Sequence, residues 1–359
     1  MKRLFALVLA VMLAMPAIAL ATSVGTGIGI NIETEKFKPL IWMCDQRVVS
    51  DDNIQWGRTS KPGEPLLERI NNYAFEGEKI KWDVLVMDKN GIEKIKDVYV
   101  TVGSVQGEGN DIQANCDISD VPKDKKPVKD GDIPESCNAR ILEEQLKKFD
   151  ADTMRYYTCT LTVEPTSSMY GQYWIVAEIE DLDGLMSTFD ENEYWYFNPV
   201  IALKIEGGLN FGNVRPGTYA YADTLLVGND ADPGSGVMMD MFITGTDFYD
   251  PASSGAKCPS TNQLELKNFA YYVVNGAYSS AADGRSDFED YVGITYGDHW
   301  DRHIYDTAEI LQAQKVGPYY TANILAPGAE MALTFRLFLP EPCNGDFSEG
   351  SIFFWGEAI

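Results

Sequence analysis

The chain has 359 residues, with 29 Lys and Arg against 54 Asp and Glu, which gives a net charge of −25. This charge argues against nucleic acid and anionic membrane surfaces as partners, because both are bound through clustered Lys and Arg. The length exceeds what one hydrophobic core usually supports, so we expect two domains.

The first 21 residues, MKRLFALVLAVMLAMPAIALA, have the pattern of a secretory signal peptide. Lys2 and Arg3 precede an apolar run, Pro16 interrupts it, and small residues end at Ala21. The alternative is an uncleaved anchor, since the run approaches the length that spans a bilayer. Pro16 and the Ala-Leu-Ala ending favour cleavage after Ala21. We therefore expect an extracellular or cell-surface protein with no membrane span after cleavage.

Within residues 22–36, expected at the new N-terminus, residues 24–32 place mainly apolar side chains in alternation with glycine and asparagine. Val24, Ile28, Ile30 and Ile32 share one face of a strand, and the other face is almost bare. One interpretation is an ordinary first strand of the first domain. The other is a strand donated to the open sheet edge of a neighbouring copy. Repeated head to tail, such a contact builds a filament or lattice.

Residues 37–203 are predicted to form a first β-sandwich. Alternating apolar residues predict strands at 78–87 and 95–102, joined by Asn90-Gly91, a strong signal for a hairpin turn. A second expected pair comprises 156–164 and 172–180, and further strands are expected at the end of this domain, at 194–197 and 200–205.

Residues 104–155 are predicted to be an irregular insertion in this sandwich, held by a disulfide. Long irregular loops are uncommon in compact domains and are often functional. A short helix is expected within it at 138–149, where Ile141, Leu142 and Phe149 contribute to an apolar face.

Residues 204–359 repeat the rhythm of short strands and turns, which predicts a second sandwich. The fold class expected for the whole chain is therefore all-β, with two tandem immunoglobulin-like β-sandwich domains. The strands expected in this second half are 209–218, 224–229, 237–245, 269–274, 331–339 and a final strand at the C-terminus.

An even number of cysteines in an exported protein predicts disulfides. We expect Cys258 to pair with Cys343, because both lie in the second half. In the first half we favour a bridge across the insertion, which leaves one further pair, although spacing alone does not decide between pairings. The two pairs expected there are Cys116–Cys137 and Cys44–Cys159.

Two parts of the sequence resemble known extracellular domains. The segments WDVLVMDKNGIEKIKDVYVTV and GQYWIVAEIEDLDG are similar to immunoglobulin-like and PKD-like domains of prokaryotic surface proteins. FGNVRPGT followed by VGND resembles the start of another secreted sandwich. The combination most resembles uncharacterised exported surface proteins of archaeal type with tandem domains. This resemblance implies a surface role and brings no catalytic residues with it.

The only two histidines, His299 and His303, are spaced so that both can lie on one side of a helix or strand. With Asp301 and Asp306 they form a candidate zinc site. Trp300 stands where a zinc protease has its catalytic glutamate. The alternative interpretation is an exposed polar turn.

Calcium is the one cofactor that the sequence otherwise suggests. Asp181 and Asp183, followed by Asp190 and Glu193, supply oxygen ligands of the type that calcium binds. No complete EF-hand pattern is present. An Asp-Gly pair in a hairpin turn also explains part of this pattern by turn chemistry alone.

The aromatic run Tyr194-Trp195-Tyr196-Phe197 supports two interpretations. If exposed, Tyr194, Trp195 and Tyr196 could stack on a glycan or a protein partner. If the run is a buried strand, Trp195 and Phe197 belong to the core and the tyrosines face outward. The core interpretation is favoured, because aromatic residues are common in strands.

The function that this sequence favours is that of a secreted or cell-surface structural or adhesive protein, self-assembling through its N-terminal strand. Its expected partners are further copies of itself or other surface proteins. The alternative is an extracellular module that binds glycans or proteins. A metal-dependent hydrolase at His299 and His303 is the third and weakest hypothesis, since Trp300 stands where the general-base glutamate would be.

Overall fold

A computed structural model describes residues 27–54, 56–107, 110, 112–119, 133, 137, 148–189, 193–252 and 255–359. The chain divides into two compact units, Met1–Lys36 and Phe37–Ile359. In the first unit, residues 27–36 form neither helix nor strand, and their side chains are almost all exposed. The described part of 22–36 is therefore not the ordinary first strand of a domain. Residues 1–21 and Val24 lie outside the described residues.

The second unit is all-β, as the sequence predicts. Its first nine strands belong to one sheet, with β8 paired to β7 beside the main path. In sheet order the strands are β1 (Leu40–Ser50), β3 (Lys79–Met87), β6 (Met154–Thr162), β5 (Ile112–Ser119), β4 (Ile95–Gly103), β7 (Gly171–Asp181), β9 (Tyr194–Phe197) and β2 (Tyr73–Ala74), with β8 at Met186–Phe189.

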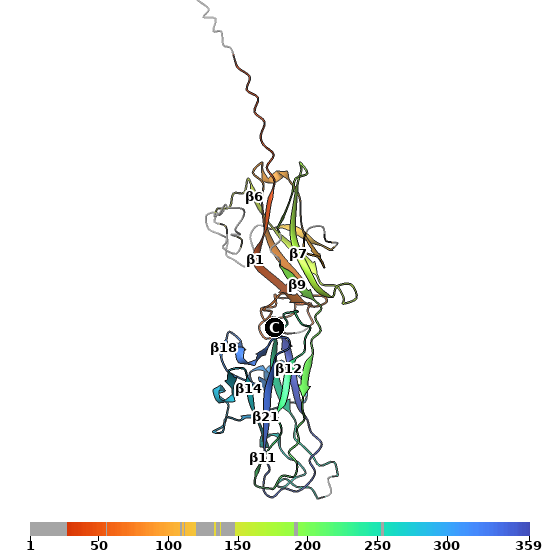
Figure 1. The fold of residues 1–359 in the computed structure, drawn as a ribbon, viewed down its shortest axis with the longest axis vertical. Helices are drawn as coiled ribbons and strands as arrows, with labels where there is room; N and C mark the ends of the chain where they lie inside the picture. The colour runs from red at the N-terminus through yellow and green to blue at the C-terminus, as the bar shows by residue number, and fades with distance from the viewer. Residues whose placement is uncertain are drawn as a thin grey trace, which may run out of the picture. The chain divides into compact units, whose positions relative to one another are not determined.

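Strand β5 pairs with β6 on one side and with β4 on the other. Figure 1 labels β1, β6, β7 and β9 of this sheet. Both halves of the sheet contribute to one core. Trp82 and Val84 from β3 pack in the same buried cluster as Val100 from β4 and Ile175 from β7. The result is a sandwich made from a single sheet.

The two predicted hairpins are wrong. Strand β3 pairs with β1 and β6, whereas β4 pairs with β5 and β7. The turn itself has the predicted chemistry, since the Asn90 N–H donates to Asp88 Oδ1 at 2.8 Å and Gly91 has φ 118°. It leads into the 3₁₀ helix η1 (Ile92–Lys94), and the chain then enters the other half of the sheet. In the same way, β6 and β7 are not paired with each other.

Three disulfides join Cys44 to Cys137, Cys116 to Cys159 and Cys258 to Cys343. The third is the predicted pair, and the two expected in the first half are wrong. The reason is that Cys116 lies on a sheet strand, directly opposite Cys159 in the register of β5 and β6. Disulfides of this number are typical of oxidising compartments such as the extracellular space.

The predicted insertion at 104–155 is therefore not irregular throughout, because it contains β5. Most of the helix expected at 138–149 lies outside the described residues. Phe149, at its end, stacks on Tyr156 with ring centroids 5.1 Å apart.

The remaining strands form a seven-stranded, a four-stranded and a two-stranded sheet. The seven-stranded sheet contains β10 (Leu203–Glu206), β12 (Leu225–Asn229), β21 (Glu330–Phe338), β14 (Phe269–Asn275) and β15 (Tyr278–Ser279), with β11 (Tyr219–Tyr221) and β16 (Val292–Gly293) beside this path. The four-stranded sheet contains β17 (Thr295–Tyr296), β13 (Met239–Gly245), β20 (Ile324–Leu325) and β22 (Ile352–Ala358); β18 (Lys315–Val316) pairs with β19 (Tyr319–Tyr320).

The seven-stranded and four-stranded sheets enclose a second core. Val227 and Leu333 from the larger sheet pack in one buried cluster with Met241 and Ile243 from the smaller one. Short helices join the strands: η4 (Leu266–Asn268), η5 (Ser280–Ala282), η6 (Arg302–Ile304), α2 (Tyr305–Ala308) and η7 (Thr321–Asn323). A domain boundary between residues 203 and 204 stays a prediction.

Candidate functional site

Strand β22 presents an open edge. It pairs with β13 along one side, and among the described residues no strand pairs with its other side. The Thr246 N–H donates to the Ser351 carbonyl at 2.9 Å, and the Ile359 N–H donates to the Met238 carbonyl at 2.9 Å. Backbone groups alternate in direction along an antiparallel strand. The N–H and C=O groups of even-numbered residues such as Ile352 and Phe354 therefore point to the open edge.

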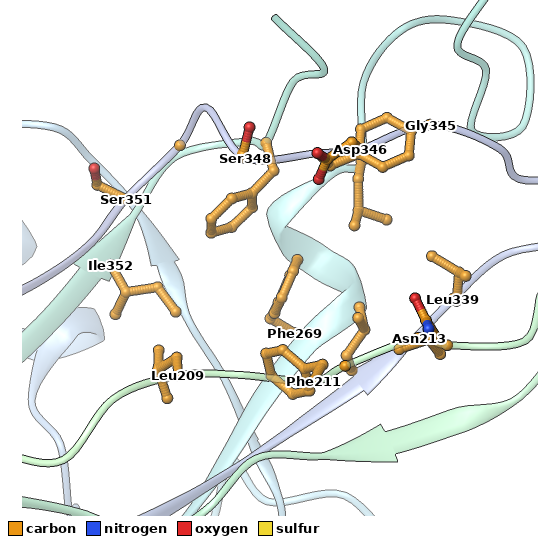
Figure 2. A pocket seen from close by; sticks show the side chains of 17 residues that line it. Leu209, Phe211, Asn213, Phe269, Leu339, Gly345, Asp346, Ser348, Ser351 and Ile352 are labelled. Carbon is orange, nitrogen blue, oxygen red and sulfur yellow. The ribbon is translucent and has the colours of Figure 1, made fainter.

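A groove of about 740 Å³ lies beside the start of β22. Figure 2 shows its two rims, one with Leu209 and Phe211 and the other with Asp346, Ser348 and Ser351. Polar groups make up much of the groove's exposed lining, and apolar side chains lie beneath it between the rims. These apolar side chains include Phe248, Leu264, Phe269 and Leu337, which belong to a satellite cluster of the second core.

The first rim is a segment that the sequence predicts to be a strand. Residues 209–218 are not paired into either sheet, and the next strand, β11, begins only at Tyr219. Leu209 is consequently 36% exposed. Phe211 packs edge to face on Phe269, with ring centroids 5.8 Å apart. An apolar strand-like segment without a strand partner therefore borders the groove.

The second rim is held in place by covalent and backbone bonds. The Cys258–Cys343 disulfide lies just before it, and the backbones of Lys257 and Asn344 exchange hydrogen bonds of 2.9 and 2.8 Å. Gly350 has φ 155°, and a Cβ there would lie 2.5 Å from the Phe248 ring. Only glycine fits this close approach, so Gly350 is required for the rim to pack against Phe248.

The N-terminal segment has the complementary character. Ile28, Ile30 and Ile32 are 91%, 80% and 79% exposed. Nothing lies within 4 Å of the position that a Cβ would take at Gly27 or Gly29. These three isoleucines, which would share one face if the segment were a strand, are thus exposed to water. β-Branched side chains are normally packed against a sheet.

The candidate zinc residues do not converge. His299 is exposed and its Nδ1 lies 2.6 Å from Asp298 Oδ1. Asp301 Oδ1 accepts a 3.0 Å hydrogen bond from the His303 N–H and so caps η6. The described part of the chain holds no group of three or more His, Cys, Asp or Glu side chains placed to bind a metal ion.

The candidate calcium residues are used by the turn between β7 and β8. Asp181 is buried, and its Oδ1 accepts a 2.7 Å hydrogen bond from the Leu185 N–H. Asp183 lies 3.9 Å from Lys94 Nζ. Asp190 lies outside the described residues. Turn chemistry thus accounts for the Asp181 carboxylate, and that of Asp183 faces a lysine.

The aromatic run forms strand β9, and its core interpretation is correct. Trp195 is 1% exposed and packs edge to face on Trp82, with ring centroids 6.1 Å apart. Phe197 is buried, whereas Tyr194 is exposed and Tyr196 is half-buried. Stacking of a glycan on Trp195 is therefore ruled out in this fold, whereas the binding-module alternative itself stays a prediction.

A buried charge cluster around Arg58 was not predicted from the sequence. The Arg58 guanidinium lies 2.6 Å from Asp240, 3.3 Å from Glu309 and 3.8 Å from Glu357. Its Cζ also lies within 4.7–5.4 Å of the centroids of three aromatic rings, those of Tyr305, Tyr319 and Phe242. Arg58 comes from the segment between β1 and β2, and its carboxylate partners come from residues far along the chain, so no local pattern signals the cluster.

Arg58 faces three acids here, and the pKa values of their carboxyl groups are raised. Burial, with the nearby Asp240, raises the pKa of Glu309 to about 8. Burial also raises the pKa of Glu357 to about 7, against the opposing effect of its hydrogen bond from Tyr305. Burial raises the pKa of Asp240 as well. Neither carboxyl oxygen of Glu309 accepts a hydrogen bond from the described residues, which fits a neutral form.

Comparisons with known proteins give no family for this chain. No family model matches it. No curated protein matches it either. The archaeal-type resemblance suggested by the sequence therefore has no support from these comparisons.

Several solved structures match weakly. A DUF4466 family protein from Parabacteroides merdae has 12% identity and a TM-score of 0.22, covering 75% of this chain and 94% of its own. The C-terminal domain of the AgI/II polypeptide BspA from Streptococcus agalactiae has 10% identity and a TM-score of 0.27, covering 87% and 96%. A chain from a chaperone–tip adhesin complex of CFA/I fimbriae has 9% identity and a TM-score of 0.23, covering 90% and 92%. Scores this low transfer neither fold nor function.

Among the described residues, no helix combines the length and the apolar content that crossing a membrane would require.

Proposed function

We propose that this chain is a secreted or cell-surface structural protein that associates with further copies of itself through its N-terminal segment. The observation that carries the proposal is the exposed alternation of Ile28, Ile30 and Ile32 within residues 27–36, which have no secondary structure of their own. The three disulfides and the signal-peptide pattern of residues 1–21 support export.

The physical reason is the free energy of exposed apolar surface. Transfer of one fully exposed isoleucine into a packed site contributes about 1.5–3 kcal/mol. An extended segment also gains backbone hydrogen bonds when it joins a sheet edge. Cleavage after Ala21 would place this segment at a free N-terminus, so removal of the signal would precede assembly.

Deletion of Thr22–Glu33 tests the proposal. We expect the mature full-length protein to form concentration-dependent assemblies and the deleted protein to remain monomeric, as measured by sedimentation velocity. Circular dichroism and thermal unfolding serve as controls for the fold of Phe37–Ile359, which is compact without the deleted residues. Association of the deleted protein to the same extent as the full-length protein would refute the proposal.

A further inference from the structure

We infer that the N-terminal segment of one copy binds in the groove beside β22 of a second copy, as an added strand. This inference rests on the proposed function and deepens it, because it names the acceptor surface. The donor residues are Gly27–Ile32, and the acceptor comprises the open edge of β22 with the rims at 209–214 and 345–351.

The backbone of β22 is suited to an added strand. Its even-numbered residues direct N–H and C=O groups away from β13, and the described residues supply no strand on that side. An exposed row of such groups is a template for pairing with another chain. Ile352 lies at the point where this edge meets the groove (Figure 2). A strand that pairs with Ile352 would therefore reach the groove at this residue.

The side chains of the donor match the groove by their spacing and position. Alternate residues of a strand point to one face and are spaced by about 6.6–7 Å. If Ile28, Ile30 and Ile32 face the apolar side chains of the groove, Gly27 and Gly29 face solvent. Apolar side chains of the acceptor, such as Phe211 and Phe269, would then cover the isoleucines. Removing these side chains from water is favourable.

The charge of the chain limits which part of a second copy can approach the groove. The whole chain carries a net charge of −25, so copies repel one another over most of their surfaces. Residues 22–32, TSVGTGIGINI, carry no charge, and the rim of the groove carries Asp346. An uncharged strand approaches this acidic rim without like-charge repulsion. Because donor and acceptor are different surfaces of one chain, the contact is head to tail and repeats.

A photo-cross-linking experiment tests the acceptor. A benzophenone amino acid replaces Ile30 in the otherwise complete mature chain, and the products of irradiation are mapped by mass spectrometry. We expect adducts between copies at 209–214 or 345–354. The same probe at position 29, on the opposite strand face, serves as the matched control and should give several-fold fewer of these adducts. Adducts confined to other surfaces, or formed only within one chain, would overturn the inference.

A groove variant separates this inference from the proposed function. Leu209→Arg places a charge at a partly exposed position of the rim, and we expect it to weaken association about tenfold or more. Leu182→Arg, at a turn position that is 62% exposed, is the matched control and should assemble normally. Thermal unfolding checks that both variants fold. If the Thr22–Glu33 deletion abolishes assembly but Leu209→Arg leaves it intact, the acceptor is wrong and the proposed function stands.

Discussion

At the scale of single residues, the unusual feature is Arg58 among three buried acids. A buried ion pair gains little net stability unless its charges are balanced. Here the balance is reached by protonation, because burial raises the pKa of Glu309 to about 8 and that of Glu357 to about 7. In the unfolded chain these groups return to the ordinary value of 4.5. The folded protein therefore binds more protons than the unfolded chain between pH 4.5 and 8.

The sign of the resulting pH dependence follows from linkage. The free energy of unfolding falls as pH rises through this window, by at most about 1.4 kcal/mol per pH unit for each group. For Asp283 and Asp287, burial has the largest single effect and raises the pKa, but hydrogen bonds from the Arg285 and Arg336 side chains and from backbone N–H groups together lower it below the ordinary value. These two groups therefore act only in more acidic solution. Stability that depends on the buried acids is therefore present near pH 5 and lost towards pH 8.

Glu309→Gln should remove part of this dependence, because the neutral amide cannot lose a proton. We expect the variant to be more stable than the wild type at pH 8 and to show a flatter decline between pH 5 and 8. Urea denaturation under non-reducing conditions at several pH values measures both. An unchanged decline in the variant would show that Glu309 does not titrate in this window.

At the scale of elements, the sequence locates strands better than it pairs them. The alternation of apolar residues identifies β3, β4, β7 and β21 correctly, because burial of one face leaves a local pattern. The prediction of a turn at Asn90-Gly91 is also correct. Which strands become neighbours depends on contacts between distant residues, and neither the pairing of β3 with β6 nor the Cys116–Cys159 bridge leaves a local signal.

Of the candidate site, only the donor segment Gly27–Ile32 could be predicted from the sequence. The alternation of Ile28, Ile30 and Ile32 is visible in the sequence, as is the final strand that becomes β22. The groove was not predictable, because 209–218 has a strand-like pattern and only the fold shows that this segment lacks a strand partner. The apolar character of Leu209 and Phe211 was the available signal.

Removal of the Cys258–Cys343 disulfide tests whether the groove rim must be fixed. We expect Cys258→Ser with Cys343→Ser to lower the free energy of unfolding by about 2–4 kcal/mol and also to weaken assembly, because residues 345–351 lose their anchor. The pair Cys44–Cys137 is the matched control, since it spans 93 residues against 85 and so constrains the unfolded chain similarly.

The control variant, Cys44→Ser with Cys137→Ser, should lose comparable stability while assembling normally at a temperature where it is folded. Denaturant titration and sedimentation velocity, applied to both double variants, give the two readings. Equal loss of assembly in the two variants would mean that overall stability, and not the rim, controls association.

At the scale of the whole molecule, the chain combines strong self-repulsion with one uncharged, apolar segment. A net charge of −25 keeps most surfaces of two copies apart, and salt weakens such repulsion. Association would then be confined to surfaces where neutral, complementary groups meet. Residues 22–32 are such a surface, and the groove beside β22 carries one acidic residue, Asp346, at its rim. Contact between them would make each copy both donor and acceptor.

Amide hydrogen exchange, measured by mass spectrometry on dilute and on assembled mature protein, tests this central claim most directly. We expect assembly to protect two separate segments together, Gly27–Ile32 and Ile352–Phe354, while exchange on the paired strand β13 is unchanged. Rapid exchange of Gly27–Ile32 in the assembled protein, or protection there without any at Ile352–Phe354, would contradict it.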